Sequence, residues 1–166
     1  MPSDVYIGSL LKTLVASKPK GNFLELGTGV GLSLSWMVDG MDDGSILTSI
    51  DNDPALISMV GTHFGDDERV RLVCQDGAQW IEEYQGNKFD LIFADAWPGK
   101  YSHLSEVLKL LRPGGLYVID DMLEQPNWPE GHHAHVMNLM ACLENRKDME
   151  LTKIQWSTGI VIAVKK

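Results

Sequence analysis

Phe23-Leu-Glu-Leu-Gly-Thr-Gly-Val-Gly-Leu-Ser33 is the stretch of sequence that decides the fold. Residues 23–26 have the character of a buried strand, and a helix is expected to begin at Leu32. Between them stand three glycines, which permit a sharp turn that a ligand can approach without meeting a Cβ atom. The helix directs free N–H groups and the positive end of its dipole toward that turn. The stretch therefore predicts a nucleotide-type site at the start of an α/β sheet.

The spacing of the glycines restricts the type of nucleotide site. Dinucleotide-binding folds carry the pattern G-x-G-x-x-G, whereas Gly27, Gly29 and Gly31 form G-x-G-x-G, with Glu25 two residues ahead. A glycine turn alone is not specific. Its interpretation depends on the residues that follow it along the chain.

The length and composition are those of one globular domain spanning residues 1–166. The chain is 44% hydrophobic and 22% charged, and its formal net charge of −9 argues against a protein that grips a nucleic-acid backbone. No apolar run approaches the length of a membrane span, and Met1-Pro-Ser-Asp4 does not look like a signal peptide. We expect a cytoplasmic location with no nucleic-acid or membrane partner.

The two cysteines give little support to a metal site. Cys74 and Cys142 lie far apart in the sequence and lack the spacing of metal ligands. The first falls in an expected strand and the second on an expected helix. We expect both to be buried thiols in a reducing compartment.

Apolar runs and helical patterns alternate along the chain. The expected strands are residues 23–26, 45–50, 70–74, 89–94, 116–119, 151–156 and 160–164. The expected helices are residues 5–15, 32–38, 54–64, 78–84, 101–111 and 133–145, and residues 112–115 are expected to form a turn. This alternation predicts a mostly parallel sheet, closed by a hairpin with one antiparallel strand near the edge. In such sheets ligands bind at the carboxyl ends of the strands.

Each of the first five expected strands ends in the glycine turn or in acidic residues. The acidic ends are Asp51-Asn52-Asp53, Gln75-Asp76, Asp95 and Asp120-Asp121. A single acidic residue in such a place is more often a helix cap or a turn former, which is the preferred interpretation for Asp53 and an alternative for Asp76. Five strands that all deliver such residues to one edge favour a binding site there.

Two of these carboxylates predict an adenosine pocket. Asp51 lies 20 residues beyond Gly31, where a carboxylate can accept hydrogen bonds from both hydroxyls of a ribose. Asp76 is placed to accept a hydrogen bond from an adenine amino group. The pair does not specify which adenosine cofactor is bound.

Four segments carry a resemblance to a known family: Glu25-Leu-Gly-Thr-Gly-Val-Gly31, Ile50-Asp51, Phe93-Ala-Asp-Ala-Trp-Pro-Gly-Lys-Tyr101 and Leu111-Arg-Pro-Gly-Gly-Leu-Tyr-Val-Ile-Asp-Asp121. With them the chain resembles class I S-adenosylmethionine-dependent methyltransferases, and within that superfamily the caffeoyl-CoA and catechol O-methyltransferase group. The likeness runs from about Tyr6 to the C-terminus. It implies a Rossmann-like seven-stranded sheet, mostly parallel with an antiparallel last strand, and helices on both faces.

The resemblance also implies which residues hold the cofactor. The methionine side of the cofactor would be lined by Glu25, Gly27 and Gly29. Asp51 would bind the ribose, and Asp76 would bind the adenine. Gly31 would pack the helix against the strand. Trp97 would wall the adenine or the acceptor pocket, with a place in the core as the alternative. The full set is Glu25, Gly27, Thr28, Gly29, Asp51, Asn52, Asp76, Gly77, Asp95 and Trp97.

In the family, a divalent metal assists deprotonation of the acceptor. The resemblance places it on Asp95, Asp120 and Asp121, an all-oxygen set suited to Mg²⁺ or a similar ion. This chain departs from the pattern in two places. The family usually has Asn at the position of Asp121, and Pro98 stands where the family has a basic lysine.

Metal dependence and the catalytic base therefore stay open. Asp95, beside the reacting centre, and Lys100, two positions beyond Pro98, are the catalytic candidates. The default interpretation of this lysine is a solvated surface residue.

The segment 122–135 is expected to form a lid or a binding loop, because irregular segments of this length beside an active site often do. Trp128 would stack on a planar acceptor or simply pack the loop onto the domain. His132, His133 and His135 would be bases or metal ligands, although a polar helix start is the preferred interpretation. Only about twenty residues precede the first strand, where the family usually has additional helices, so we expect a more open acceptor pocket.

The expected function is S-adenosylmethionine-dependent methylation of an oxygen atom on a small-molecule acceptor. One alternative is a metal-independent N- or carboxyl-methyltransferase of the same fold. An NAD-dependent oxidoreductase is disfavoured by the glycine spacing and the terminal hairpin. A cofactor-binding protein without catalysis is the last alternative, suggested by Pro98.

Overall fold

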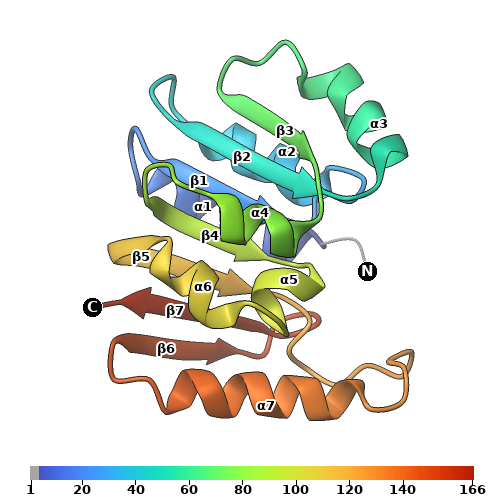
Figure 1. Ribbon diagram of the computed structural model, residues 1–166, viewed down its shortest axis with the longest axis vertical. Helices are drawn as coiled ribbons and strands as arrows, with labels where there is room; N and C mark the ends of the chain where they lie inside the picture. The colour runs from blue at the N-terminus through green and yellow to red at the C-terminus, as the bar shows by residue number, and fades with distance from the viewer. Residues whose placement is uncertain (1–3) are drawn as a thin grey trace.

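The computed structural model of the chain describes residues 4–166, and its centre is a seven-stranded sheet (Figure 1). The strands follow the order β3-β2-β1-β4-β5-β7-β6. Their bounds are β1 Asn22–Leu26, β2 Ile46–Asp51, β3 Val70–Cys74, β4 Phe89–Ala94, β5 Leu111–Ile119, β6 Met149–Ile154 and β7 Ile160–Lys165. The first five strands pair in parallel, and β7 runs antiparallel to both of its neighbours. The predicted α/β class with an antiparallel last strand is confirmed.

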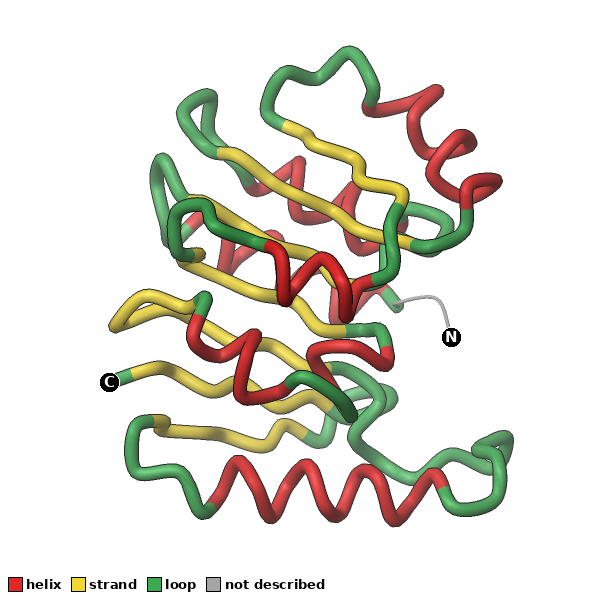
Figure 2. Tube along the Cα trace, in the orientation of Figure 1, coloured by secondary structure: helices red, strands yellow, loops and turns green. Residues whose placement is uncertain are grey.

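Helices cover both faces of this sheet (Figure 2). They are α1 Val5–Ala16, α2 Leu32–Gly40, α3 Pro54–Phe64, α4 Gly77–Glu83, α5 Trp97–Lys100, α6 Leu104–Lys109 and α7 His132–Glu144. One apolar core lies between the sheet and α1, α2 and α3, and a second lies between the sheet and α4, α6 and α7. None of the helices described between residues 4 and 166 is long and apolar enough to cross a membrane.

The alternation of side chains along each strand produces the two cores. In β1, Phe23 points into the core under α1 and α2, whereas Leu24 and Leu26 point into the opposite core. Strand β4 divides its apolar residues in the same way, with Phe93 on the first side and Ile92 on the second. Both strands are buried on both faces, as expected for central parallel strands with helices on either side.

Carboxylates begin three of the helices. Asp4 caps α1, Asp53 caps α3 and Asp76 caps α4, and each side chain accepts hydrogen bonds from backbone N–H groups of the first turn. The preferred interpretation of Asp53 as a helix cap is therefore confirmed.

The predicted helix 101–111 is wrong in its extent, because only Leu104–Lys109 of that range is helical, as α6, and a separate short helix, α5, precedes it at Trp97–Lys100. Pro98 and Gly99 in α5 have non-helical backbone angles, and the φ of Gly99 is +85°. His103 then adopts a left-handed conformation with φ +56° before α6 begins. The helical path is broken twice within seven residues, which turns Lys100 toward the interior.

The predicted turn at residues 112–115 is part of β5. Phe89 of β4 pairs with Leu111 and Leu91 pairs with Leu116, so the longer segment of β5 bulges out of the ladder between these pairs. Gly114 accommodates the bulge with φ +75°. At the other end of the chain β6 covers Met149–Ile154, two residues earlier than expected.

The prediction that both cysteines are buried is wrong. Cys74 is exposed because it ends β3, which is the edge strand of the sheet. Cys142 is exposed because α7 turns Leu139 and Leu143 toward the core and leaves Cys142 on its outer face. Strand and helix were assigned correctly at these positions, but the sequence does not show which side of each element faces solvent.

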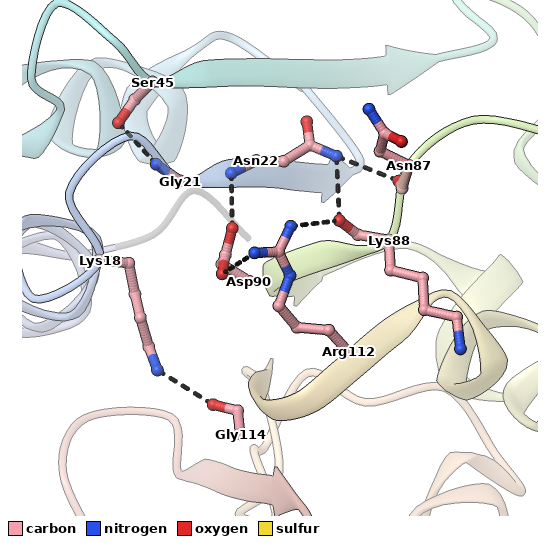
Figure 3. Close-up of polar contacts among 9 residues, drawn as sticks. All are labelled: Lys18, Gly21, Asn22, Ser45, Asn87, Lys88, Asp90, Arg112 and Gly114. Carbon is pink, nitrogen blue, oxygen red and sulfur yellow. Dashed lines mark hydrogen bonds and ion pairs between the residues drawn. The ribbon is translucent and has the colours of Figure 1, made fainter.

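A polar network joins the starts of three neighbouring strands at the amino end of the sheet (Figure 3). Asp90 of β4 is its centre. Its Oδ2 accepts a hydrogen bond from the backbone N–H of Asn22, at 2.8 Å, and its Oδ1 lies 3.0 Å from the Arg112 guanidinium. Arg112 also donates to the backbone carbonyl of Lys88. The network lies at the end of the sheet opposite the glycine turn.

Replacing Asp90 by alanine should lower the free energy of unfolding by about 2 kcal/mol, because a nearly buried N–H and a guanidinium lose their partner. Urea denaturation measures the change. Asp148→Ala is the control, since this aspartate pairs with Arg146 at the surface and should contribute less than about 1 kcal/mol. Equal losses in the two variants would contradict a structural role for the network.

Candidate functional site

The glycine turn after β1 is held in a conformation that glycine adopts without strain. Gly27, Gly29 and Gly31 have φ values of +100°, +51° and +83°. The N–H groups of Gly27 and Thr28 both donate to the carbonyl of Ile50, at 2.9 and 3.2 Å, which fixes the turn against the end of β2. A Cβ atom on Gly27 would lie 3.2 Å from the backbone of Asp95, so the turn also lies close to the end of β4.

Gly31 has a different neighbour from the one the resemblance implied. A Cβ atom here would lie 3.1 Å from a methyl group of Val60 in α3. The residue also stands at the N-cap of α2 in a left-handed conformation. It therefore permits a close approach of α3 to the start of α2.

A pocket of about 230 Å³ opens beside this turn at the carboxyl edge of the sheet. It lies where the chain leaves the ends of β1, β2, β3 and β4. Its lining is Leu26, Gly27, Ile50, Asp51, Asn52, Asp76, Gly77, Ala96, Trp97 and Pro98. Six of the residues predicted to bind the cofactor thus meet around one cavity. Trp97 lines it and is 51% exposed, so it does not belong to the core.

Asp51 is the best-oriented carboxylate of this pocket. Its Oδ2 accepts a hydrogen bond from the N–H of Gly29, at 2.9 Å, and its Oδ1 accepts one from the N–H of Asp53, at 3.0 Å. An ionised carboxylate has about four acceptor sites, so these two bonds fix its orientation and leave further sites for a ligand.

Asp76 caps a helix and also lies at the pocket. Its Oδ1 caps α4 by accepting from the N–H groups of Ala78 and Gln79, each at 3.0 Å, and the residue also lines the pocket. A Cβ atom on the neighbouring Gly77 would lie 3.3 Å from Pro98, so the pocket is narrow between α4 and α5.

Other predicted residues lie behind the turn. Glu25 is fully buried and accepts a hydrogen bond from Ser49, whose hydroxyl also bonds to that of Thr28 at 2.6 Å. Burial raises the pKa of Glu25 to about 7, against the hydrogen bonds from Ser33 and Ser49. The hydrogen bonds among Glu25, Ser49 and Thr28 therefore support the glycine turn from within the sheet.

The raised pKa of Glu25 should make the fold less stable as the pH rises from about 5 to 7. Over this range the folded chain keeps a proton that the unfolded chain, with the ordinary pKa of 4.5, has lost. The free energy of unfolding should fall on the order of 1 kcal/mol per pH unit because of this one group. Urea denaturation at several pH values should show a shallower fall in Glu25→Gln, and identical slopes would contradict the assignment.

A second polar cluster lies at the ends of β4 and β5. Ala94 pairs with Ile119, so Asp95 and Asp120, which follow them, are neighbours at the sheet edge. Asp120 is 2% exposed and accepts from the hydroxyl of Thr158 at 2.7 Å. Burial raises the pKa of Asp95 to about 7, with Lys100 opposing the shift.

Lys100 belongs to this cluster and is not the solvated residue expected from the sequence. It is 5% exposed, although its neighbour Trp97 on the same short helix is mostly open to solvent. Burial lowers the pKa of its ammonium, while Asp95, Asp121 and Asp120 raise it. The pKa of this lysine therefore responds to all three carboxylates that the resemblance places around a metal.

The three carboxylates themselves do not form a metal-binding arrangement. Within residues 4–166, no three His, Cys, Asp or Glu side chains are placed together as metal ligands. One oxygen of Asp120 is taken by Thr158 and by the backbone N–H of Asp121. The residues present fit a divalent ion poorly.

An aromatic group closes the outer side of the cluster. Its members come from α5 and its C-cap, from the segment 120–131 and from the start of α7: Trp97, Tyr101, Trp128, His132 and His135. The Trp97 ring lies 4.8 Å from His135, and the rings of Trp128 and His132 are 4.6 Å apart. The Tyr101 hydroxyl is 3.1 Å from Nε2 of His132. The group joins the segment and α7 to the edge of the pocket.

The family model for a methyltransferase domain matches residues 24–122. The match begins inside β1, includes the glycine turn and all four acidic strand ends, and covers more than half of the chain. This chain belongs to the methyltransferase domain family.

Curated proteins that are similar to this methyltransferase domain carry O-methyltransferase names. A candidate O-methyltransferase of Mycobacterium avium (strain 104) is 31% identical over 118 residues, which are 68% of this chain and 53% of the relative. A second, from Mycolicibacterium vanbaalenii, is 31% identical with 68% and 52% covered. The chain thus spans about half the length of the curated relatives it matches.

Solved structures share the fold of this methyltransferase domain. The O-methyltransferase from Bacillus cereus, in complex with SAH, has a TM-score of 0.85 at 22% identity, with 99% of this chain and 83% of that chain covered. TomG from Streptomyces achromogenes, in complex with SAM, has a TM-score of 0.87 at 23% identity, with 99% and 82% covered. The architecture is therefore shared over nearly the whole of this chain.

Sequence reasoning missed part of the site of this methyltransferase domain. His132, His133 and His135 all lie in the first turn of α7, which confirms the preferred interpretation of a polar helix start. What the sequence does not show is that the rings of His132 and His135 also lie against Tyr101 and Trp97. The spacing of Trp97 and Tyr101, four residues apart, is the signal that could have indicated an aromatic surface.

Proposed function

We propose that this chain is an S-adenosylmethionine-dependent methyltransferase that acts on an oxygen atom of a small-molecule acceptor. The observation that carries the proposal is the Asp51 carboxylate, oriented by the N–H of Gly29 at the edge of the pocket beside the glycine turn. Support comes from the relatives named as O-methyltransferases and from similar folds that bind SAH or SAM.

The cofactor would lie along the carboxyl edge of the sheet. Its ribose hydroxyls would donate to the free acceptor sites of Asp51, and its adenine would enter the narrow part of the pocket between Gly77 and Pro98, with Asp76 at its amino group. The methionine end would then extend past Gly27 toward Asp95. This direction brings the sulfonium toward the second polar cluster.

Methyl transfer from a sulfonium is an in-line displacement. The bond between sulfur and the methyl carbon breaks as the bond between the acceptor oxygen and that carbon forms, and the cofactor leaves as a neutral thioether. The protein must hold the three atoms in line and favour removal of the hydroxyl proton. The ionised carboxylate of Asp95 would take the proton of the acceptor hydroxyl, and the buried charge of Lys100 would favour the oxyanion that develops.

No step of this proposal passes through a divalent metal. Carboxylate oxygens suit Mg²⁺, but the set of Asp95, Asp120 and Asp121 is not arranged as ligands in the described part of the chain. All three carboxylates raise the pKa of Lys100, against the larger effect of its burial. The acceptor is proposed to be a small molecule rather than a nucleic acid, because the net charge is −9. The proposed location is the cytoplasm, in line with two free cysteines.

Transfer of a labelled methyl group tests the function. The chain would be incubated with methyl-labelled S-adenosylmethionine and separate panels of phenols, amines and carboxylic acids. We expect S-adenosylhomocysteine and a labelled ether that resists mild alkali, formed only in the phenol panel. Label released by alkali would instead indicate a carboxyl-methyltransferase. Absence of label in every panel, with cofactor binding intact, would contradict catalysis by this chain.

A further inference from the structure

We propose that Tyr101 is a positioning residue that joins the cofactor pocket to the segment 120–131. Its ring contacts Trp97 in the pocket wall, and its hydroxyl binds His132, against which Trp128 of the segment packs. Occupation of the pocket would then set the segment that borders the proposed place of the acceptor. The connection between the two tryptophan rings is independent of the proposed function. Its consequence, that the cofactor prepares the acceptor side, rests on it.

Trp97 is the first member of this connection. It lines the pocket at the start of α5 and is 51% exposed. A ligand in the pocket covers part of the ring and restricts its conformations. The edges and faces of two other rings meet it, with centroids 4.9 Å away in Tyr101 and 4.8 Å away in His135. A change at Trp97 therefore reaches the end of α5 and the start of α7.

Tyr101 is fixed between these two helices. As the C-cap of α5 it donates its backbone N–H to the carbonyl of Trp97, at 2.9 Å. The ammonium of Lys100 lies 5.3 Å from its ring centroid, and its hydroxyl lies 3.1 Å from Nε2 of His132. Burial raises the pKa of Tyr101 to about 12 and lowers the pKa of His132. At neutral pH the hydroxyl therefore donates to a neutral imidazole.

The hydrogen bond determines how the rings fit together. Contacts between aromatic rings are attractive over a range of orientations, whereas a hydrogen bond weakens steeply when it is bent. His132 and His135 are three residues apart on α7, so one face of the helix presents both rings to α5. The bond from Tyr101 sets the position of that face against the pocket wall.

The segment carries the connection on to Trp128. The ring of this tryptophan lies 4.6 Å from that of His132. Its N–H donates to the carbonyl of Gln125, and the N–H of His132 donates to that of Pro129, each at 3.1 Å. Figure 1 shows the segment at the carboxyl edge of the sheet, between β5 and α7. Trp128 does not line the cofactor pocket but a separate cavity of about 270 Å³ beside α7. Its ring can therefore report an effect that a ligand exerts from a distance.

Fluorine NMR of protein labelled with fluorotryptophan tests the proposal, with S-adenosylhomocysteine as the probe. The resonances of Trp97 and Trp128 are assigned by their loss in Trp97→Phe and Trp128→Phe. We expect saturating S-adenosylhomocysteine to shift both resonances in the wild type. Tyr101→Phe keeps the ring and removes the hydroxyl, so the response of Trp128 should fall to less than about half, while that of Trp97 remains.

A second variant removes the other partner of the same hydrogen bond. His132→Phe keeps a ring beside Trp128 and should act as Tyr101→Phe does. The two changes together should have no more effect than either alone, because they remove one interaction. Each variant should also weaken binding of S-adenosylhomocysteine about two- to tenfold, the range for one hydrogen bond.

Tyr84→Phe is the matched control. The hydroxyl of Tyr84 donates to the carbonyl of Asn87, at 2.8 Å, and the residue does not line the pocket. The same chemical change should here leave the affinity for S-adenosylhomocysteine and the response of Trp128 as in the wild type.

Two results would overturn the proposal. One is a Trp128 resonance that does not respond when the wild type binds S-adenosylhomocysteine. The other is an equal response of Trp128 in Tyr101→Phe, His132→Phe and the wild type. A wild type that binds no S-adenosylhomocysteine would fail the proposed function instead. The free protein then decides the connection, because Trp97→Phe should shift the Trp128 resonance when Tyr101 is present and not in Tyr101→Phe.

Discussion

Replacing Asp51 by alanine should weaken the binding of S-adenosylhomocysteine at least about 100-fold, or about 3 kcal/mol. The variant would lose the proposed acceptor for two ribose hydroxyls, and hydrogen bonds to a charged group contribute about 1.5–3 kcal/mol each. It also releases the N–H of Gly29, which the carboxylate holds at 2.9 Å. Isothermal titration calorimetry gives the change in Kd directly.

Asp53→Ala is the matched control for this prediction. Asp53 lies two residues further along, caps α3 through the N–H of Ala55 and does not line the pocket. Its loss should lower the free energy of unfolding by about 1 kcal/mol and leave the Kd within about twofold. Similar affinities of Asp51→Ala and the wild type for S-adenosylhomocysteine would contradict the assignment of Asp51 to the ribose.

Replacing Gly27 by alanine should weaken cofactor binding by about 10- to 100-fold, or 1.4–2.8 kcal/mol. At φ +100° an L-residue is strained, and the new Cβ would lie 3.2 Å from the backbone of Asp95. The chain from Asp95 to Ala96 must move outward to accept it. That movement changes the wall of the pocket on the side where the methionine end is proposed to lie. Calorimetric titration again gives the affinity.

Gly114→Ala separates the effect of backbone strain from that of the pocket. Gly114 has φ +75°, and a Cβ atom there would meet nothing within 4 Å. Both variants should therefore lose about 1–2 kcal/mol of stability, and only Gly27→Ala should lose affinity. Equal affinities in the two variants would show that the glycine turn does not shape the binding site.

The topology of the sheet could be predicted because its signals are local. Each central strand is an apolar run followed by glycine or an acidic residue, most clearly in β1 and β4. The start of each following helix is also marked by nearby residues in the sequence. The proposed adenosine side of the site follows from the same local signals. Asp51 ends β2 and Asp76 lies two residues beyond the end of β3, so the register of a parallel sheet brings them to one edge.

The acceptor side could not be predicted in the same way because tertiary contacts determine it. The inward direction of Lys100 depends on the left-handed conformation of Gly99 and on its bond to Tyr117, 18 residues away. The pairing of His132 with Tyr101 joins residues 31 positions apart. Neither contact leaves a periodic signal in the sequence.

The two exposed cysteines and the bulge of β5 have similar causes. The exposure of Cys74 follows from the position of β3 at the edge of the sheet, which depends on the order of all seven strands. The bulge around Gly114 follows from the pairing of Phe89 with Leu111. Without knowledge of that pairing, the sequence of residues 112–115 is typical of a simple turn. Composition and periodicity do not contain this information.

Calorimetric titration of the wild-type chain with S-adenosylhomocysteine, and separately with NAD, tests the central claim most directly. We predict one site for S-adenosylhomocysteine with a Kd in the micromolar range or below, about −8 kcal/mol or tighter, and no heat of binding with NAD. Binding of NAD without binding of S-adenosylhomocysteine would contradict the assignment of this pocket to a methyl donor.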